Sequence, residues 1–339
     1  MRRCLDLAIS GAGFVSPNPL VGSVIVHNDI IIGEGYHKKY GQAHAEVNAI
    51  NSVKDKSLLK NAILYVNLEP CSHFGKTPPC CDLIIGCGIK KVIIGTVDTC
   101  SAVDGGGIKK LKQSGCVVVT AVLEKECRDI NKRFFCYHEK KRPYIILKWA
   151  KTSDEYVDIL RKPGSGISPL GITDNISNML VHKWRSEEDS ILVGRNTALL
   201  DNPKLNVRKI SGRNPIRMVI DPKLLLPDNL HLFDGSTPTI VFTAYNKKEK
   251  KNLKYIKIDF CDDINSILKS IHDNNILSVI VEGGPILQKS FIEKSLWDEA
   301  RIFTGNTEIG EGVKAPELEG QLYSKEIIGN TNLEIFLPY

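Results

Sequence analysis

The segments HAE at residues 44–46 and PCSHFGKTPPC at residues 70–80 decide how this chain of 339 residues folds and which chemistry it carries. They supply three candidate zinc ligands, His44, Cys71 and Cys80. One imidazole and two thiolates can hold zinc with a fourth position open for water, and bound zinc lowers the pKa of that water to about 7. Glu46 follows at the start of a predicted helix, where its carboxylate can reach the same water without binding the metal. The pattern predicts a zinc-dependent deaminase that acts on a pyrimidine-like ring.

The spacing of the cysteines leaves a second interpretation open. Zinc deaminases commonly place two residues between the two cysteines, whereas residues 72–79 separate them here. A closed structural zinc site, with Cys81 or His73 as its fourth ligand, would make Glu46 an ordinary helix-start carboxylate. Cys80 and Cys81 are adjacent, so only one of them is expected to point at a metal while the other is a core thiol.

Composition is that of a folded protein with two domains. The chain has 42% hydrophobic and 25% charged residues and a net charge of +6. No apolar run approaches the roughly 20 residues that a membrane-spanning helix needs. The basic start at Met1 is followed by Asp6 within the first apolar stretch, so it predicts a first helix rather than a signal peptide. Nine of the ten cysteines precede residue 140, which indicates two differently built halves and thiols kept reduced in a cytoplasm.

Strand and helix patterns alternate in both halves and predict an α/β fold with helices covering each sheet. The polar stretch 138–142 before Pro143 is the expected domain boundary, giving domains 1–142 and 143–339. The predicted strands of the first half are 21–26, 63–67, 92–95 and 117–120, and its predicted helices are 45–53 and 81–87. The predicted strands of the second half are 144–149, 190–194, 216–221, 239–243 and 278–282, and its predicted helices are 176–187, 264–272 and 285–295.

Longer motifs carry a family resemblance. They are Pro17 to Gly22, Gly33 to His37, His44 to Val47 and Leu68 to Cys81. With these motifs the chain resembles the bifunctional riboflavin-biosynthesis deaminase-reductases, in which the long cysteine spacing is usual. The resemblance implies a cytidine-deaminase-like three-layer α/β/α domain followed by a dihydrofolate-reductase-like α/β domain. The implied reactions are zinc-dependent deamination of a diaminohydroxypyrimidine bearing a ribosylamino phosphate, then NADPH-dependent reduction of the ribosyl to a ribityl chain.

The resemblance assigns roles in the deaminase half. His44, Cys71 and Cys80 become zinc ligands and Glu46 the proton shuttle, while the pyrimidine and phosphate pocket is implied to be lined by Asn18, His37, His73 and Lys76. Each of these four residues also has a purely structural interpretation. Asn18 between two prolines can stabilise a turn, the two histidines can be core residues, and Lys76 can be a solvated loop residue.

The reductase half matches the family less closely. Substrate contacts are implied for Arg185, Leu205, Arg208 and Glu282, and NADPH contacts for Ala150, Thr197, Asp201 and Gly284. Surface arginines, a solvated strand-end carboxylate and a tight glycine turn are the structural interpretations of the same residues. Two departures stand beside the expected cofactor site, where Glu155 replaces a usual glycine and Gly171 replaces a usual tryptophan.

Three other functions remain open from the sequence. They are a deaminase with a degraded second domain, a non-catalytic zinc module that binds nucleic acid, and a deaminase of polynucleotide bases. The two-activity enzyme leads, because no aromatic-rich basic segment indicates nucleic-acid binding and because the reductase-like half would have no role in a deaminase of polynucleotide bases. We expect a cytoplasmic protein that binds a small phosphorylated pyrimidine, zinc and NADPH, with no nucleic acid or membrane partner, and the resemblance implies a homo-oligomer.

Overall fold

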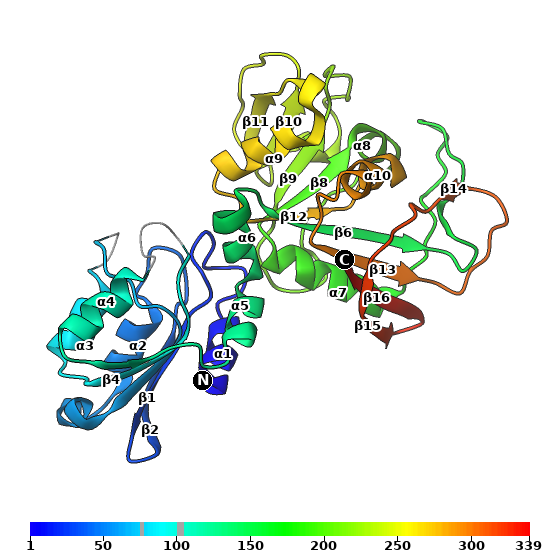
Figure 1. The fold of residues 1–339 in the computed structure, drawn as a ribbon. Helices are drawn as coiled ribbons and strands as arrows, with labels where there is room; N and C mark the ends of the chain where they lie inside the picture. The colour runs from blue at the N-terminus through cyan, green and yellow to red at the C-terminus, as the bar shows by residue number, and fades with distance from the viewer. Residues whose placement is uncertain (75–77, 100–104) are drawn as a thin grey trace. The chain divides into compact units, whose positions relative to one another are not determined.

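The computed structural model describes residues 1–74, 78–99 and 105–339, without the side chains of Asp262 and Asp263. The chain divides into two compact units, Met1–Lys141 and Arg142–Tyr339, which are described separately (Figure 1). Each unit contains its own sheet and its own apolar core. No helix among the described residues has the length and apolar composition to cross a membrane.

The N-terminal unit is built on a five-stranded sheet with the order β2-β1-β3-β4-β5. The central strand pairs antiparallel with β1, and the last three strands run parallel to one another. The strands are β1 (Gly22–His27), β2 (Ile30–Tyr36), β3 (Ile63–Leu68), β4 (Lys91–Thr96) and β5 (Val117–Val119). Of these, β2 lies outside the strands that the sequence predicts, because its exposed half carries apolar residues without a clear alternation.

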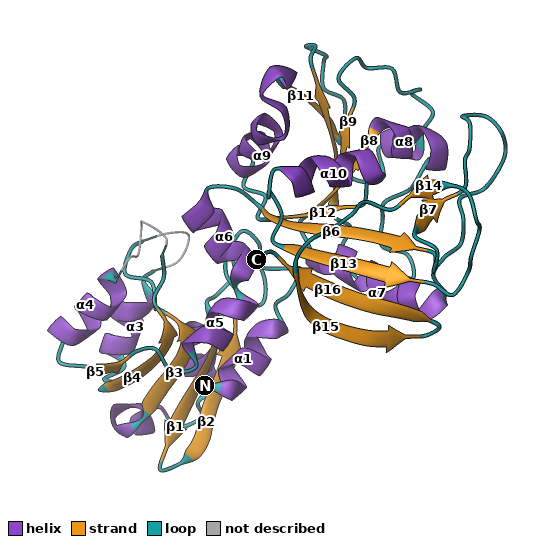
Figure 2. Ribbon diagram, turned by 45° about the vertical axis from the view of Figure 1, so that its right-hand side comes forward, coloured by secondary structure: helices purple, strands orange, loops and turns teal. Residues whose placement is uncertain are grey.

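Helices cover both faces of this sheet (Figure 2). The first face carries α1 (Arg2–Ile9) and α5 (Glu124–Ile130), which contact each other. The second face carries α2 (Ala45–Ser52), α3 (Cys80–Gly86) and α4 (Gly106–Gln113), and the 3-10 helix η1 (Lys56–Asn61) and α6 (Lys132–Lys140) complete the unit. Ile50, Ile84 and Leu111 from the second layer are buried against Leu64 and Ile94 of the sheet. The three-layer α/β/α arrangement of the sequence analysis is confirmed.

The C-terminal unit is built on a nine-stranded sheet with the order β11-β10-β9-β8-β12-β6-β13-β16-β15. All neighbouring pairs from β11 to β13 are parallel, and β16 and β15 continue the sheet antiparallel. The strands are β6 (Tyr144–Lys151), β8 (Ser190–Gly194), β9 (Ile216–Ile220), β10 (Thr239–Thr243), β11 (Leu253–Lys257), β12 (Ser278–Val281), β13 (Glu299–Thr304), β15 (Gln321–Ile328) and β16 (Thr331–Leu337). A separate two-stranded ribbon joins β7 (Tyr156–Asp158) to β14 (Val313–Lys314).

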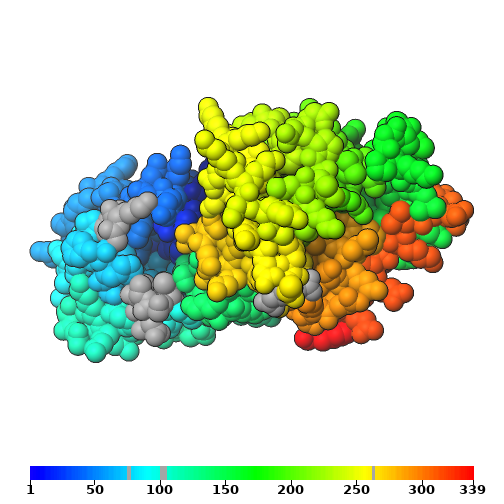
Figure 3. All heavy atoms as spheres, turned by 90° about the horizontal axis from the view of Figure 1, so that it is seen from above, coloured from blue at the N-terminus to red at the C-terminus, as the bar shows by residue number. Residues whose placement is uncertain are grey.

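Alternate residues of the parallel strands enter two cores, one on each face of this sheet. α9 (Asp263–Asp273) and α10 (Pro285–Glu293) cover one face, while α8 (Arg195–Asp201) packs on the other. α7 (Asn175–Glu187) packs Trp184 against Phe303 of β13, and the unit also has the short 3-10 helices η2 (His231–Phe233) and η3 (Phe260–Asp262). In the surface view the yellow segment around β11 lies beside the yellow-green segment of β9 and β10 (Figure 3).

The topology places three strand ends together. β12 lies between β8 and β6, and all three are parallel, so their carboxyl ends meet at one edge of the sheet. In open α/β sheets, ligands bind at this edge. The residues just beyond these strand ends are therefore the first place to look for a site.

Candidate functional site

Three potential metal ligands converge in the N-terminal unit. His44 is the N-cap of α2, Cys71 follows the end of β3, and Cys80 is the first residue of α3. The Nδ1 atom of His44 lies 3.6 Å from Cys71 Sγ and 3.3 Å from Cys80 Sγ. The backbone N–H of Cys80 donates to Cys71 Sγ over 3.3 Å, which supports a negative charge on that sulfur.

These distances fit zinc. Bond lengths of about 2.3 Å to sulfur and 2.0 Å to nitrogen in a tetrahedron give a nitrogen–sulfur separation of about 3.5 Å. The three ligand atoms all lie within 4.8 Å of one another, so one ion can reach all three. Hydrogen bonding with Cys80 lowers the pKa of Cys71, and the hydrogen bond with Cys71 raises the pKa of His44. The donor set, with one nitrogen and two soft sulfurs, is the kind that zinc prefers.

The two residues proposed as alternative fourth ligands lie elsewhere. The thiol of Cys81 donates to the carbonyl oxygens of Pro70 at 3.3 Å and Gly107 at 3.6 Å, and burial raises its pKa to about 12. His73 is exposed and does not belong to the cluster. Within the described residues the cluster therefore has three protein ligands, as catalytic zinc sites do, rather than the four of a closed structural site.

Glu46 lies beside this cluster, in the first turn of α2. It is 3% exposed, and burial raises the pKa of its carboxyl to about 7. Its side chain also hydrogen-bonds with Cys80, so the carboxylate faces the metal ligands rather than solvent. This is the placement that a proton shuttle outside the metal shell requires.

His37 and Asn18 form the next part of the site. The ring of His37 meets the ring of His44 edge-on, with 5.4 Å between the centroids. His37 Nδ1 donates to the carbonyl oxygen of Ala43 at 3.1 Å, so its Nε2 accepts from the side-chain amide of Asn18 at 3.1 Å. Burial lowers the pKa of His37, which keeps this imidazole neutral. Lys76, the fourth predicted contact, lies outside the described residues.

One residue of this unit was not predicted to matter. Glu69 is 4% exposed, and its carboxylate accepts four backbone N–H groups, from Asp98, Gly105, Gly107 and Ile108, over 2.9 to 3.2 Å. A Cβ added at Gly107 would lie 2.1 Å from the carbonyl oxygen of Pro70. The start of α4 thus packs directly against the peptide that precedes Cys71. The available signal was an acidic residue directly after a mostly apolar strand.

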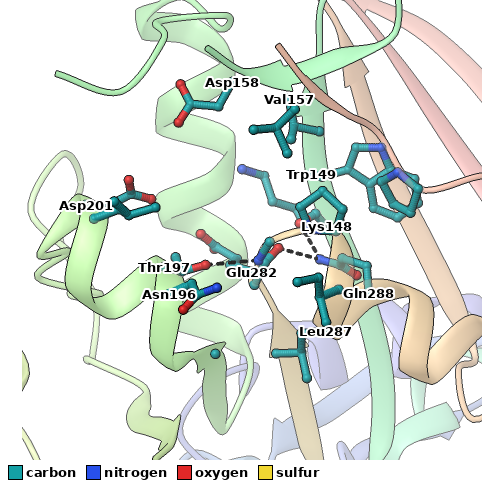
Figure 4. Close-up of a pocket in the computed structure, with 18 of the residues that line it drawn as sticks. Lys148, Trp149, Val157, Asp158, Asn196, Thr197, Asp201, Glu282, Leu287 and Gln288 are labelled. Carbon is teal, nitrogen blue, oxygen red and sulfur yellow. Dashed lines mark hydrogen bonds between the residues drawn. The ribbon is translucent and has the colours of Figure 1, made fainter. Parts of the chain in front are cut away.

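A large cavity occupies the predicted edge of the C-terminal sheet. Its volume is about 920 Å³, which is within the range of cofactor sites. It is bordered by the ends of β6, β8 and β12 and by the first residues of α8 and α10. All four residues implied to contact NADPH line it, namely Ala150, Thr197, Asp201 and Gly284. Glu282 lines it as well, and Figure 4 shows Glu282 with Thr197 and Asp201.

The glycine turn before α10 suits a nucleotide cofactor. The N–H of Gly284 donates to Thr197 Oγ1 at 3.0 Å, which fixes the turn against α8. A Cβ at Gly284 would have only that hydroxyl nearby, at 3.5 Å, and one at Gly171 would meet no atom within 4 Å. At Gly284 and Gly171 the backbone is therefore open to the cavity, so a ligand can approach it closely. A glycine turn at the start of a helix suits the phosphates of NADPH.

A buried group of charges forms the floor of this cavity. Arg185 on α7 donates two hydrogen bonds to the carboxylate of Glu282, from Nε to Oε1 at 3.0 Å and from Nη2 to Oε2 at 2.6 Å. Burial alone would raise the pKa of Glu282, but the charges of Arg185 and Lys148 lower it to about 2. Glu282 is therefore a carboxylate at neutral pH, and the guanidinium of Arg185 is occupied in holding it.

Lys148 is the most informative residue that received no predicted role. Its side chain reaches into the space bordered by Asp158, Asp201 and Glu282 (Figure 4). Burial lowers the pKa of its ammonium, while Glu282 opposes that effect. The signal was a single lysine in the apolar strand that runs from Tyr144 to Ala150.

The remaining predicted residues lie outside the cavity lining. Leu205 is 3% exposed and packs in the core beneath α8. Arg208 is exposed, and its guanidinium contacts the side chain of Asn206 at 3.1 Å. Its backbone N–H donates to His182 Nδ1 at 3.4 Å, which ties this loop to α7 beside Arg185.

The two departures from the family pattern have different structural consequences. Glu155 has a φ of 72°, the left-handed region that glycine adopts most easily, and its carboxylate pairs with Lys151 at 2.7 Å. Glu155 therefore keeps the left-handed backbone conformation that the usual glycine would adopt, but with more backbone strain. Gly171 lines the cavity and leaves it wider, since no side chain fills the space beyond it.

Comparisons with known proteins match both units. A family model for the cytidine and deoxycytidylate deaminase zinc-binding region matches residues 1–96, and one for the RibD C-terminal domain matches residues 143–334. The riboflavin biosynthesis protein RibD of Aquifex aeolicus is 39% identical over 324 residues, which cover 94% of this chain and 89% of that protein. The RibD protein of Bacillus amyloliquefaciens is 38% identical over 332 residues, with coverages of 94% and 86%.

Solved structures agree over the full length. The diaminohydroxyphosphoribosylaminopyrimidine deaminase/5-amino-6-(5-phosphoribosylamino)uracil reductase of Thermotoga maritima matches with a TM-score of 0.89 and 35% identity, covering 100% of this chain and 97% of that one. RibD of Acinetobacter baumannii matches with a TM-score of 0.90, 27% identity and the same coverages. The chain therefore belongs to the RibD family of bifunctional riboflavin-biosynthesis enzymes, which join a zinc-binding deaminase domain to an NADPH-dependent reductase domain.

Proposed function

We propose that residues 1–142 deaminate the diaminohydroxypyrimidine that bears a ribosylamino 5′-phosphate, and that residues 143–339 then reduce its ribosyl group to a ribityl chain. The observation that carries the proposal is the pairing, in one chain, of a three-ligand cluster beside buried Glu46 with a cavity that contains Lys148 and Glu282. This pairing favours two working domains over a deaminase with a degraded second half.

In the deaminase, the chain's own residues hold the substrate and move protons. Zinc, when bound by His44, Cys71 and Cys80, activates water for attack on the amino-bearing ring carbon at neutral pH. The Glu46 carboxylate takes a proton from the attacking water and delivers it to the ring nitrogen, and it then transfers a second proton, from the hydroxyl now on the ring carbon, to the amino group, which leaves as ammonia while that carbon becomes a carbonyl. His37 and Asn18, already bonded to each other, orient the pyrimidine, and His73 and Lys76 bind its polar edge and phosphate.

In the reductase, the residues that line the cavity hold the cofactor. NADPH, when bound, supplies the hydride for the ribosyl carbon. Ala150, Thr197, Asp201 and Gly284 hold the cofactor along the cavity wall.

The substrate is held by residues that neighbour these cofactor contacts in the sequence, Lys148 in the same strand as Ala150 and Glu282 just before Gly284. Lys148 donates to polar atoms of the pyrimidine, and Glu282 lies beside the ribosyl group, held as a carboxylate by Arg185. Arg208, exposed at the edge of this region, binds the phosphate, while Leu205 packs beneath its loop. Arg185 acts on the substrate through Glu282, because its guanidinium already spans that carboxylate.

A coupled assay on zinc-loaded protein tests the proposal. Ammonia release and NADPH oxidation are followed separately, starting from the diaminopyrimidine phosphate and again from its deaminated product. We expect both signals, and we expect Glu46→Gln to abolish ammonia release while NADPH oxidation from the deaminated product is retained. Absence of ammonia with zinc bound would refute the substrate assignment, and ammonia without NADPH oxidation would restrict the function to the deaminase.

We also propose that this protein works in the cytoplasm as a homo-oligomer and without nucleic acid. Cys4, Cys81, Cys87 and Cys127 of the N-terminal unit form no disulfide bond in the described part of the chain, as a reducing compartment favours. Sedimentation at micromolar concentration tests the oligomer, and polynucleotide binding in low salt tests the absence of a nucleic-acid partner.

A further inference from the structure

Arg161 lies at the rim of the cavity and is buried although it belongs to a loop. Its side chain is 3% exposed, and it stands three residues beyond β7, at the start of the connection 159–174 to α7. Its guanidinium donates to three groups. Nε donates to Asp158 Oδ2 at 2.8 Å, Nη1 to the Leu200 carbonyl oxygen at 3.2 Å, and Nη2 to Asp201 Oδ1 at 2.5 Å. A second bond joins Nη2 to Asp158 Oδ2. The start of the connection is thereby fixed to the end of α8.

Asp158 fixes the other end of the same connection. Its Oδ1 accepts the backbone N–H of Leu170 at 3.0 Å, while Oδ2 accepts Arg161. The residues between, 162–169, are all exposed, and their hydrogen bonds are local, such as Ser165 N–H to the Lys162 carbonyl at 3.1 Å. One carboxylate therefore closes the loop on itself, and Arg161 attaches that carboxylate to α8.

This three-way contact forms part of the cavity wall. Asp158, Arg161, Leu170 and Asp201 all line the cavity, together with Gly171, which offers no side chain to anchor the connection. Burial raises the pKa of Asp201, and the neighbouring guanidinium opposes that effect. Without Arg161, the carboxylates of Asp158 and Asp201 would lose the guanidinium that is hydrogen-bonded to both of them, and their like charges would then repel. The wall would then separate.

We propose that Arg161 is a positioning residue of the reductase, which fixes the Asp201 carboxylate and the connection between β7 and α7 as one wall of the cavity before ligands bind. The inference rests on the reductase activity proposed for this unit. A preformed wall spares ligands the cost of ordering it. If loss of Arg161 leaves the wall assembled in about a tenth of the molecules, the apparent Kd of a ligand that needs the wall rises about tenfold.

Three variants test this role. They are Arg161→Ala, Arg161→Lys and, as a matched control from the exposed part of the same loop, Lys162→Ala. The measurements are the Kd of NADPH by equilibrium titration, KM and kcat of NADPH oxidation with the deaminated pyrimidine, and hydrogen exchange at the Leu170 amide. Ammonia release from the same preparations checks that the N-terminal unit is intact, and tryptophan fluorescence checks that the C-terminal unit is folded.

For Arg161→Ala we expect Kd and KM to rise about tenfold, kcat to fall less than about threefold, and Leu170 exchange to accelerate at least about tenfold. Arg161→Lys restores part of the binding, because an ammonium reaches one carboxylate but lacks the planar fork that spans both. Lys162→Ala behaves as the unmodified chain.

Two results would overturn the inference. One is an Arg161→Ala protein with unchanged Kd and KM, and the other is a fall in kcat alone, which would place Arg161 in the chemical step. An unmodified chain that oxidises no NADPH refutes the reductase itself. In that case the hydrogen exchange of the Leu170 amide still tests the positioning role by itself, because an unchanged exchange rate in Arg161→Ala would show that Arg161 does not fix this connection.

Discussion

The ion pair of Glu282 and Arg185 makes a quantitative prediction about stability. Glu282→Gln removes the only negative partner of a bidentate pair whose side chains are 10% and 11% exposed. A carboxyl whose pKa falls from 4.5 to about 2 on folding contributes about 3 kcal/mol at pH 7. Breaking a buried ion pair by removing one partner costs a similar amount, about 3–5 kcal/mol. We therefore expect Glu282→Gln to lower the free energy of unfolding of the C-terminal unit by about 3 kcal/mol at pH 7.

The pH dependence follows from the direction of the shift. Because the folded pKa of Glu282 lies below its unfolded value, its contribution is complete above about pH 5 and is lost as the pH falls toward 2. At pH 3 the difference between the two proteins should shrink to about 1 kcal/mol, since the carboxyl is then largely protonated in the unfolded chain.

Urea unfolding followed by tryptophan fluorescence measures this difference. The three tryptophans of the chain, Trp149, Trp184 and Trp297, all lie in the C-terminal unit, so the signal reports that unit alone. Glu293→Gln on α10 is the control, because its pair with Lys289 is more than 60% exposed and should contribute less than about 0.5 kcal/mol. A difference for Glu282→Gln below about 1 kcal/mol at pH 7, or one that stays constant down to pH 3, would refute the reasoning.

Four further substitutions have expected outcomes. Cys80→Ser should lower the zinc retained after dialysis below about one tenth of an equivalent and abolish ammonia release, with NADPH oxidation unchanged; metal analysis and the split assay check both. Gly107→Ala should destabilise the N-terminal unit by about 1–3 kcal/mol and speed zinc loss to a chelator, because the new methyl group would lie 2.1 Å from the Pro70 carbonyl oxygen. Gly171→Trp should change the free energy of unfolding by less than about 0.5 kcal/mol and tighten NADPH binding in a fluorescence titration, since the added side chain enters open space in the cavity. Lys148→Met should lower kcat/KM of NADPH oxidation at least tenfold, because it removes the ammonium that reaches into the cavity, and should also raise the pKa of Glu282, since the Lys148 charge helps to keep that carboxylate ionised; unchanged kinetics would contradict the role given to Lys148.

The parts of the fold that follow local patterns were predictable. The strands at Ser190–Gly194 and Thr239–Thr243 occur with the predicted bounds, since short runs of β-branched residues between turn signals identify buried parallel strands. The helix that carries Glu46 begins at Ala45, because the apolar period starts directly after His44. The antiparallel β16 and β15 were not predicted, because β15 is mostly exposed and β16 alternates between buried and half-buried residues only over its first four positions.

The site was predictable only where its residues stand in a motif. The cluster of His44, Cys71 and Cys80 could be assembled from spacing and resemblance, and the structure brings these residues together. The bond between Arg185 and Glu282 joins residues 97 positions apart, and that between Arg161 and Asp201 joins residues 40 apart. Such pairs depend on which strands are neighbours in the sheet, which a single sequence does not reveal. A substrate contact was accordingly implied for Arg185, whereas its guanidinium is hydrogen-bonded to Glu282.

The carboxylate of Glu69 has a consequence for the peptide that leads to Cys71. A single oxygen of this carboxylate, Oε2, accepts hydrogen bonds from the backbone N–H groups of both Asp98 and Gly105. Two backbone groups that lie seven residues apart in the sequence are therefore held at one atom, directly beside the peptide that leads to Cys71. The position of that peptide thus depends on a buried carboxylate that is not itself a metal ligand.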